Sequence, residues 1–533
     1  MSALVAVLML TGCKSSNKSE AEATEAAADY SSIQSAPLPD ADMAETTETA
    51  NSYANADIVA HNTEEYDRII ENDFKDAKAN PLSTFSIDVD NASYTNVRRI
   101  IKSGQLPEKG AVRIEEFINY FEYEYPQPQG ADPFSITAEV WDAPWAKDHQ
   151  LVRIGLQGKK LDYSQVKPGN LVFLLDTSGS MEDPNKLPLL RDAFMLMVDN
   201  LPAGSRVSIV TYAGSAGLVL PPTPIDEKGK IKEALGNLQA GGSTAGGDGL
   251  ALAYKTAQAN FIENGNNRVI LATDGDFNVG ISSRSGLLEL IEKNKGNEIF
   301  LTICGFGMGN YKDGTMEEIS NWGDGNYFYI DSIDEARKVF QKELLANLFV
   351  IAKDVKIQVE FNPTQVQAYR LIGYENRVMA NEDFNDDTKD AGELGAGHRV
   401  TALYEVVPTG VPFDARKTDK LKYQQPAQVA ASAGSDLLTV KLRYKPIGSN
   451  KSLLLEKEVS KTSVQPGKDA RFVSAVAGFG MLLRESKYKG TLTYDMVKDL
   501  ANSGITTNDE LKKEFVSLVK DAADLTKNTA SRE

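Results

Sequence analysis

The stretch that decides the fold reads LVFLLDTSGS and covers residues 171–180. Its first five residues form a continuous apolar run, which is typical of a strand buried on both faces. The rest places Asp176, Ser178 and Ser180 at alternate positions, and the glycine between the two serines permits a tight turn. In a parallel α/β sheet, ligands bind just outside the carboxyl ends of the strands. The stretch therefore predicts a central strand whose end carries three oxygen donors.

Around this strand, apolar runs and amphipathic stretches alternate as far as about residue 350. Further strands are predicted at 206–212, 268–272, 298–304 and 327–330. Helices are predicted at 186–201, 228–238, 249–260, 286–293 and 333–352. Strands that alternate with helices are typical of a parallel sheet covered by helices on both faces. We therefore expect the segment 166–352 to be an α/β domain with a doubly wound, Rossmann-like parallel sheet.

Two further segments offer oxygen donors at the edge where such a sheet would bind a ligand. Thr244 lies in the glycine-rich stretch 241–247 between two predicted helices, and Asp274 follows the buried strand that ends at Ala272. Carboxylate and hydroxyl oxygens are hard ligands, which select Mg²⁺, Mn²⁺ or Ca²⁺. The sequence thus predicts a divalent-metal site built from three loops.

This combination resembles the metal-ion-dependent adhesion site (MIDAS) of von Willebrand factor type A (VWA) domains. The resemblance implies that Ser178 and Ser180 bind Mg²⁺ directly, and that Asp176 and Asp274 act largely through water. It also implies that Thr244 joins the ion when ligand is bound, and that the sixth position takes water or an Asp or Glu carboxylate of a partner. All five positions hold the residue types that the family pattern requires.

The segments on either side differ in character from the central one. Residues 66–165 mix helix and strand patterns, whereas 353–533 are rich in strand patterns and become helical from Asp469. We hypothesise that strands before and after 166–352 share one sheet, which would make the central domain an insertion. Together the three parts resemble bacterial lipoproteins of the YfbK-like type, which carry a von Willebrand-associated N-terminal region and a C-terminal domain of unknown function.

The first thirteen residues, MSALVAVLMLTGC, have the pattern of a secretory signal. Their apolar run, 3–10, is too short for a bilayer span of about 20 residues and suits a signal h-region. The run ends in Leu-Thr-Gly-Cys, which resembles a bacterial lipobox and implies cleavage before Cys13 and lipidation of that residue. The alternative is a buried apolar N-terminus with a chance cysteine. Lys14 favours, by resemblance to enterobacterial sorting rules, the outer membrane, with the chain facing the periplasm or the cell surface.

Composition sets the remaining expectations for the chain of 533 residues. Residues 14–65 are acidic and poor in large aliphatic side chains, so we expect a disordered tether.

The formal charge of −18 argues against nucleic-acid binding, because phosphates must be neutralised by Lys and Arg. Two cysteines exclude a disulfide framework, and Cys304 lies in an apolar run where a free thiol behaves as a small hydrophobic group. The three histidines form no zinc-protease motif.

Binding of a protein ligand is the principal functional hypothesis. A Mg²⁺ ion held mostly through water by two carboxylates would keep positive character and attract an acidic side chain of an unidentified partner. One alternative is a structural envelope lipoprotein in which the metal only stabilises the fold. A metal-dependent hydrolase is the weaker alternative, because no histidine lies near the donor residues in sequence, and we expect no enzymatic activity. In VWA relatives that couple binding to shape, the last helix moves, so we also expect site occupancy to be communicated through 333–352 to the β-rich domain.

Overall fold

The computed structural model describes residues 64–162, 166–242, 246–275, 284–309, 311–413, 434–506 and 508–530. All of these residues belong to one compact unit, Ala60–Glu533. Cys13, most of the expected tether and Thr244 lie outside the described residues, so the expectations about them stay predictions. In the described ranges, none of the helices combines the length and the apolar character that a bilayer crossing requires.

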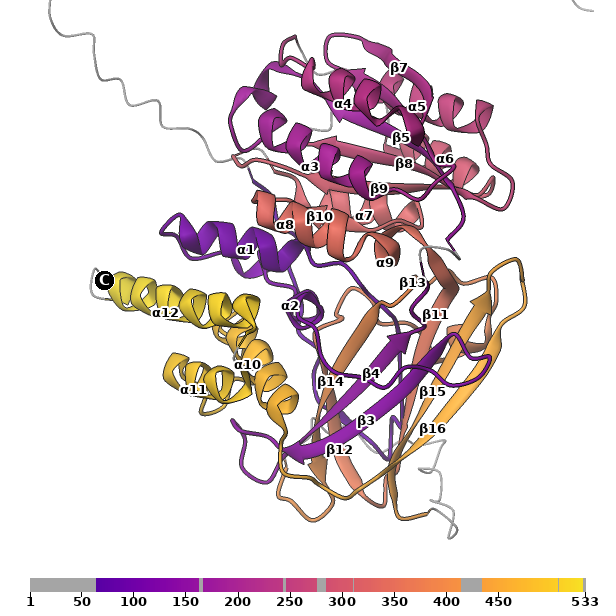
Figure 1. The fold of residues 1–533 in the computed structure, drawn as a ribbon. Coiled ribbons are helices and arrows are strands. Elements are labelled where there is room, and N and C mark those ends of the chain that lie inside the picture. Colours follow the sequence, from indigo (N-terminus) through magenta and orange to yellow (C-terminus); the bar gives the residue numbers. More distant parts are fainter. Residues whose placement is uncertain are drawn as a thin grey trace, which may run out of the picture. The chain divides into compact units, whose positions relative to one another are not determined.

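A six-stranded sheet forms the core of the central domain (Figure 1). Its strands are β5 (Gly169–Asp176), β6 (Arg206–Tyr212), β7 (Ala216–Pro224), β8 (Asn266–Thr273), β9 (Ile299–Gly305) and β10 (Tyr327–Tyr329), in the order β10-β9-β8-β5-β6-β7. All neighbouring pairs are parallel except β6 and β7. The doubly wound α/β fold is therefore confirmed. The sequence does not predict β7, because its segment AGLVLPPTP contains two adjacent prolines, which only an edge strand tolerates.

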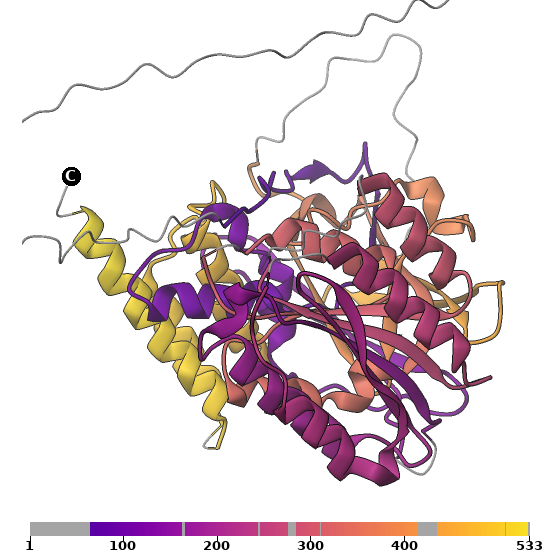
Figure 2. The ribbon, with the colours of Figure 1, turned by 90° about the horizontal axis from the view of Figure 1, so that it is seen from above.

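The side chains of β5 alternate between two cores, which explains its unbroken apolar sequence. Phe173 packs on one face of the sheet, where its ring lies 4.7 Å from that of Phe194. Val172 and Leu174 pack on the opposite face. The helices that cover the two faces are α3 (Leu187–Asn200), α4 (Lys228–Gly236), α5 (Gly246–Ala259), α6 (Arg284–Lys295) and α7 (Asp313–Trp322). Figure 2 shows helices on both sides of the sheet.

The end of the central domain differs from the predicted single helix at 333–352. The segment forms α8 (Ile333–Arg337), a π-helical turn (Lys338–Lys342) and α9 (Leu344–Leu348). The chain then enters strand β11 at Val350, which pairs with Gly395. The apolar periodicity of Leu344–Ile351 does not reveal this change, because short apolar runs suit both helix and strand.

Two further sheets are built from strands on both sides of the central domain. The first is β1 (Lys75–Asp76), β12 (Val366–Ile372), β14 (Arg399–Pro408), β4 (Gln150–Gly158) and β3 (Phe134–Asp142). The second is β13 (Gly392–Gly395), β11 (Val350–Phe361), β15 (Asp436–Pro446) and β16 (Leu453–Ser460), with β2 (Leu82–Ser86) paired to β11. Because β4 precedes the central domain and its partner β14 follows it, the hypothesis of an inserted domain is confirmed.

Helices from both ends of the chain form a separate core beside these sheets. They are α1 (Ala92–Lys102), α2 (Ile114–Tyr120), α10 (Lys468–Leu483), α11 (Tyr494–Gly504) and α12 (Glu510–Ala530). Aromatic rings dominate their contacts: Phe121 lies 5.0 Å from Phe472 and 5.5 Å from Phe515. The helical end of the chain predicted from Asp469 onward is therefore confirmed, and it packs on the N-terminal helices.

A buried arginine joins this helical core to the central domain. Arg98 of α1 binds both carboxylate oxygens of Asp331, at 2.7 and 2.6 Å, and one oxygen of Glu335 at 2.9 Å. The arginine is 3% exposed. Removing one partner of a buried ion pair strongly destabilises a protein, because the other charge is left buried and unpaired. This contact therefore fixes the start of α8 against α1.

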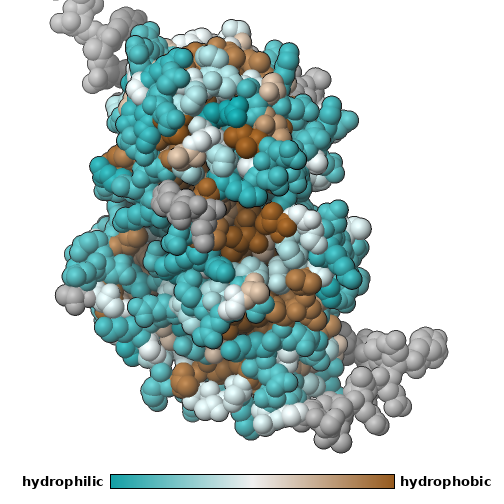
Figure 3. Space-filling model, turned by 45° about the vertical axis from the view of Figure 1, so that its right-hand side comes forward, coloured by the Kyte–Doolittle hydropathy of each residue, from teal (hydrophilic) through white to brown (hydrophobic). Residues whose placement is uncertain are grey.

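Apolar surface also gathers at the boundary of the central domain, and Figure 3 shows an apolar hollow about half-way along one face. A cavity of about 450 Å³ lies where the chain passes from α9 into β11. Apolar residues that line it are Leu161, Val166, Phe300, Phe349, Ile351 and Ile447. The boundary therefore combines charged and apolar contacts, as interfaces between domains of one chain commonly do.

Candidate metal centre

The predicted donors lie at the carboxyl ends of two neighbouring parallel strands. β5 pairs with β8 so that Leu175 lies opposite Ala272. Asp176, the last residue of β5, and Asp274, just beyond β8, therefore reach the same edge of the sheet. Both carboxylates are 0% exposed, so the fold brings two acidic groups together out of solvent.

The turn after β5 places both serine hydroxyls beside these acids. The amide of Ser178 donates a hydrogen bond of 2.9 Å to Asp176 Oδ1. A 3-10 turn, Gly179–Glu182, then brings the Ser180 hydroxyl to 3.0 Å from the Ser178 hydroxyl. Ser178 is 1% exposed, whereas Ser180 is exposed. The donor set is therefore closed on the side of the sheet and open at Ser180.

The glycine-rich stretch lies against this turn. The Gly179 amide donates to the Gly242 carbonyl at 3.0 Å, and the Gly241 amide donates to the Thr177 carbonyl at 2.8 Å. Gly242 has a positive φ of 85°, a conformation that favours glycine. These bonds hold the start of the stretch at the site, while Thr244 itself lies outside the described residues.

Burial dominates the electrostatics of Asp176. Burial raises the pKa of its carboxyl from 3.8 to about 6, although hydrogen bonds from Ser178 oppose the rise, and the nearby charge of Asp274 adds to it. The Thr273 hydroxyl donates to Asp176 Oδ2 at 3.2 Å. Burial and the charge of Asp176 also raise the pKa of the Tyr212 hydroxyl. Without a cation, the site therefore disfavours the ionised form of the Asp176 carboxyl.

The donor set fits a small octahedral cation. Adjacent ligands of such an ion, each at 2.0–2.1 Å, lie about 3 Å apart, which matches the 3.0 Å between the two serine hydroxyls. Asp176 and Asp274 contribute two carboxylates, and Lys186 Nζ lies 3.0 Å from Asp274 Oδ2. The two acids and the lysine leave one net negative charge. The residues present can therefore hold a divalent ion, with Ser178 and Ser180 as direct ligands and the carboxylates beside them.

Sequence reasoning missed two residues of this site, Lys186 and Tyr212. Lys186 precedes α3 and is 5% exposed, although a lysine at the start of an amphipathic helix is ordinarily solvated. Tyr212 ends β6 and is fully buried, where a strand pattern predicts only an apolar contact. The one signal in the sequence that could have pointed to Lys186 is the need for a cation to balance two buried carboxylates.

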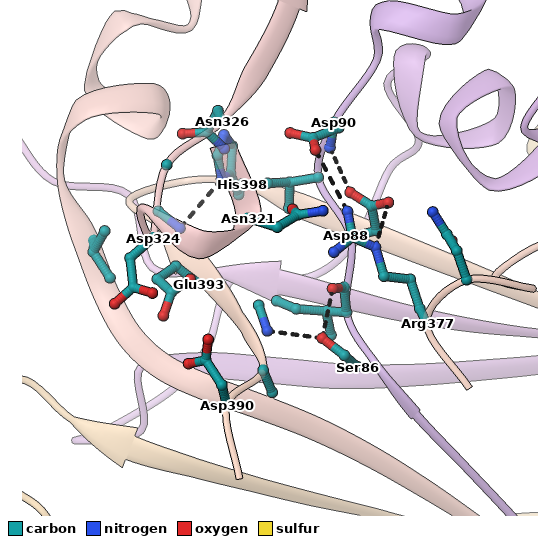
Figure 4. A pocket seen from close by; sticks show the side chains of 18 of the residues that line it. Ser86, Asp88, Asp90, Asn321, Asp324, Asn326, Arg377, Asp390, Glu393 and His398 are labelled. Atoms are coloured by element: carbon teal, nitrogen blue, oxygen red, sulfur yellow. Dashed lines mark hydrogen bonds and ion pairs between the residues drawn. The ribbon is translucent and has the colours of Figure 1, made fainter. Parts of the chain in front are cut away.

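A second polar cavity, of about 240 Å³, lies between the central domain and the β-sheets (Figure 4). Four of its five carboxyl groups, those of Asp88, Asp90, Asp324 and Asp390, are paired with cations, whereas burial raises the pKa of Glu393 well above its usual value. Arg377 lies 3.0 Å from Asp88 and 3.5 Å from Asp90. Lys295, outside the cavity wall, binds Asp324 and lies 2.8 Å from Asp390. We therefore read this cavity as a structural charge network and assign no metal to it.

Carboxylate oxygens of Asp88, Glu116 and Glu317 also lie within 4.8 Å of one another. Two arginines lie against this cluster. Arg377 Nε lies 3.0 Å from Asp88, and Arg113 binds Glu116 and lies 3.4 Å from Glu317. The cluster thus joins three parts of the fold by ion pairs.

Cys304, which the sequence predicts to be a core residue, lies in the interior of the central domain. Cys304 is 0% exposed in β9, and burial raises the pKa of its thiol. A buried thiol of raised pKa is a poor nucleophile. Its expected role as a core residue is confirmed.

Comparisons with known proteins agree with the architecture. Three family models match: "von Willebrand factor" at residues 60–153, "von Willebrand factor type A domain" at 171–276, and "Uncharacterized protein YfbK, C-terminal" at 346–525. The chain is 38% identical over 467 residues to "Uncharacterized protein YfbK" of Escherichia coli (strain K12), which covers 86% of this chain and 81% of that protein.

Two solved structures are among those to which the chain is similar. A von Willebrand factor type A protein from Catenulispora acidiphila is 16% identical, with a TM-score of 0.39, and the match covers 70% of this chain and 87% of that one. Proximal thread matrix protein 1 of the mussel byssus, whose MIDAS motif is occupied by zinc, is 22% identical with a TM-score of 0.28, and the match covers 36% and 46%.

The relation to the Escherichia coli protein extends over most of both chains, and the three family models follow the same order as the three structural parts. The chain therefore belongs to the YfbK family, and its central part is a von Willebrand factor type A domain.

Proposed function

We propose that this protein is an envelope-anchored binding module that captures an acidic residue of a partner protein through a divalent metal ion. The exposure of the donor set carries this proposal. Asp176, Asp274 and Ser178 are buried, and Ser180 opens to solvent. An ion held there would keep its protein ligands on the buried side and an exchangeable position on the open side, which suits a carboxylate from outside.

Mg²⁺ is the ion that the spacing favours, with Mn²⁺ as a close substitute. The 3.0 Å between the hydroxyls of Ser178 and Ser180 suits bonds of about 2.1 Å. Ca²⁺ has bonds of 2.3–2.6 Å, so it would need the two hydroxyls to separate. An ion of this kind acts as an electrophile that accepts an oxygen ligand from the partner.

The surroundings favour binding over catalysis. A hydrolase that used this ion would need a general base within hydrogen-bond reach of the attacking water. The two histidines of the described ranges are engaged elsewhere: His149 lies 2.7 Å from Glu405, and His398 lies 3.1 Å from Asn347. We propose that the protein acts by binding and has no enzymatic activity. Turnover of generic phosphoesters or peptides by the purified protein, lost in Asp176→Ala, would overturn this inference.

The test of binding is a crosslinking pull-down from envelope extract with Mg²⁺ or with EDTA. We expect a specific partner in Mg²⁺ that is lost in EDTA and in Asp176→Ala. The matched control is Glu182→Gln, which removes an exposed acid from the same turn and should leave the partner bound. A partner captured equally in EDTA would contradict a metal-dependent contact.

Thr244→Ala separates this proposal from a purely structural metal. If the threonine joins the ion when ligand arrives, the variant should lose the partner while Mg²⁺ still raises its melting temperature. Partner binding that survives in this variant, together with the same rise in melting temperature, would make the metal structural.

Communication between the metal centre and the β-sheets is part of the proposal. α8, the π-helical turn and α9 lead directly into β11, and π-helical segments are frequently found at functional sites. Hydrogen exchange with and without Mg²⁺ and the captured partner should change across Ile333–Phe361. Unchanged protection over that segment would exclude the coupling.

The anchor at Cys13 is a separate proposal, and so is its location in the bacterial envelope, with the outer membrane favoured. Wild-type protein should sediment with membranes and take up labelled fatty acid, whereas Cys13→Ala should do neither. Fatty-acid labelling that persists in Cys13→Ala would place the modification elsewhere.

A further inference from the structure

Lys186 is a buried cation in direct contact with the metal-donor loops. Its Nζ lies 3.0 Å from Asp274 Oδ2 and donates a hydrogen bond of 2.9 Å to the Ser180 carbonyl oxygen. Its side chain is 7% exposed. Two of the three ammonium protons are thus directed at one acidic residue of the site and at the backbone of another donor residue.

The backbone on the opposite side is shaped to hold this side chain. Gly307 has a φ of 74°, and a Cβ atom there would lie 2.5 Å from Lys186 Cε and 2.6 Å from Cγ. A contact that short does not occur between real side chains, so any larger residue would displace the lysine. Gly307 belongs to the glycine-rich turn after β9, which has no other part in the proposed function. The position of the ammonium group is therefore set by two loops.

The charge of Lys186 changes what a bound metal can do. Asp176 and Asp274 alone would neutralise a divalent ion completely, and a further carboxylate would then make the site negative. Asp183 also lies 4.0 Å from Nζ, but it is 69% exposed, so solvent screens its charge. Among the buried groups, the ion together with Lys186 leaves one net positive charge, which a single carboxylate of a partner neutralises. Electrostatic energies of this kind are large when the groups are buried.

We infer that Lys186 is a positioning and charge-setting residue, which weakens metal binding and leaves the bound metal one positive charge for an acidic ligand. This inference rests on the proposed function, because it assumes that the site holds a divalent ion. A merely structural lysine makes the opposite prediction: its loss would disorder Asp274 and weaken metal binding.

The experiment compares Lys186→Met, which keeps the aliphatic stem, with Lys186→Arg, which keeps the charge. Mn²⁺ binding to the purified full chain is measured by electron paramagnetic resonance, and Mg²⁺ by competition, with no partner present. We expect Lys186→Met to bind Mn²⁺ more tightly by on the order of tenfold or more, and Lys186→Arg to stay close to wild type. The rise in melting temperature on adding Mg²⁺ should also be larger in Lys186→Met.

The outcomes separate the inference from the function on which it rests. Equal or weaker Mn²⁺ binding in a folded Lys186→Met overturns the role of Lys186 and leaves the metal site standing. No binding in either wild type or Lys186→Met overturns the metal site itself. If Lys186→Met does not fold, Lys186→Gln serves in its place, because it keeps a polar side chain and carries no charge.

Discussion

Replacing Asp176 by asparagine should stabilise the metal-free protein while abolishing metal binding. Asp176 is 0% exposed, and burial raises the pKa of its carboxyl from 3.8 to about 6. Asparagine has nearly the same shape, and its carbonyl oxygen can still accept the hydrogen bond from the Ser178 amide. Its NH₂ group would face the Thr273 hydroxyl, which can accept a hydrogen bond in place of the one it donates to Asp176. The substitution therefore removes a charge that the fold disfavours while keeping the local packing. Residues of functional sites are often destabilising in this way.

The direction of the pH dependence follows from the raised pKa. Between pH 3.8 and about pH 6 the folded state binds more protons at Asp176 than the unfolded state does. Stability is therefore lost as the pH rises through that interval, and the loss is complete above it. The rise from 3.8 to about 6 corresponds to about 3 kcal/mol. At pH 7.5, Asp176→Asn should be more stable than wild type by up to that amount, and at pH 4 by little.

The assay is urea unfolding followed by tryptophan fluorescence and circular dichroism, in EDTA at pH 7.5 and pH 4. A second series at pH 7.5 contains Mg²⁺, which should stabilise the wild type and leave Asp176→Asn unchanged. Glu182→Gln is the control for loss of an exposed acid nearby. The reasoning is refuted if Asp176→Asn is less stable than wild type in EDTA at pH 7.5, or if its gain is the same at both pH values.

Three further predictions concern other parts of the fold. In urea unfolding, Arg98→Met should lower the free energy of unfolding by about 3–5 kcal/mol, because it leaves buried carboxylates unpaired. The control is Glu514→Gln, which removes a partially exposed acid 3.5 Å from the same arginine and should lower the free energy of unfolding by less than about 1 kcal/mol. Burial lowers the pKa of His398 from 6.5 to about 4, so stability should fall as the pH drops through that interval, by about 3 kcal/mol in all; His398→Gln should lose this part of the acid sensitivity, and an unchanged pH profile would contradict it. Cys304 should resist alkylation by iodoacetamide in the native protein and react after unfolding, as peptide mass spectrometry would show; rapid native labelling would mean that β9 opens.

The convergence of Asp176 and Asp274 could be predicted because their positions follow from strand ends alone. An apolar run that ends in Asp176, and another that is followed by Asp274, must meet at one edge of a parallel sheet. Lys186 could not be predicted in this way, because nothing in the helical pattern separates a lysine that turns inward from one that is solvated. The break within 333–352 escaped prediction for a related reason: the strand β11 is specified by its partners, and no residue of the segment itself demands it.

The inserted topology is consistent with the proposed presentation of a metal centre and with its proposed coupling to the β-sheets. The chain enters the central domain at the amino end of β5, and the cavity beside α9 and β11 is lined by Asn266 and Phe300, from the amino ends of β8 and β9. Entry and exit therefore lie at the edge of the sheet opposite to Asp176 and Asp274. The entry and the exit are thus kept away from the metal edge, which suits a site for an external ligand. Because the entry follows β4 of one sheet and the exit begins β11 of the other, any shift of α8 and α9 on binding must be taken up between the two sheets. Arg98, which ties α8 to α1, is one of the contacts that would resist the shift. Its removal should therefore both destabilise the protein and increase the change in hydrogen exchange caused by Mg²⁺ and the partner.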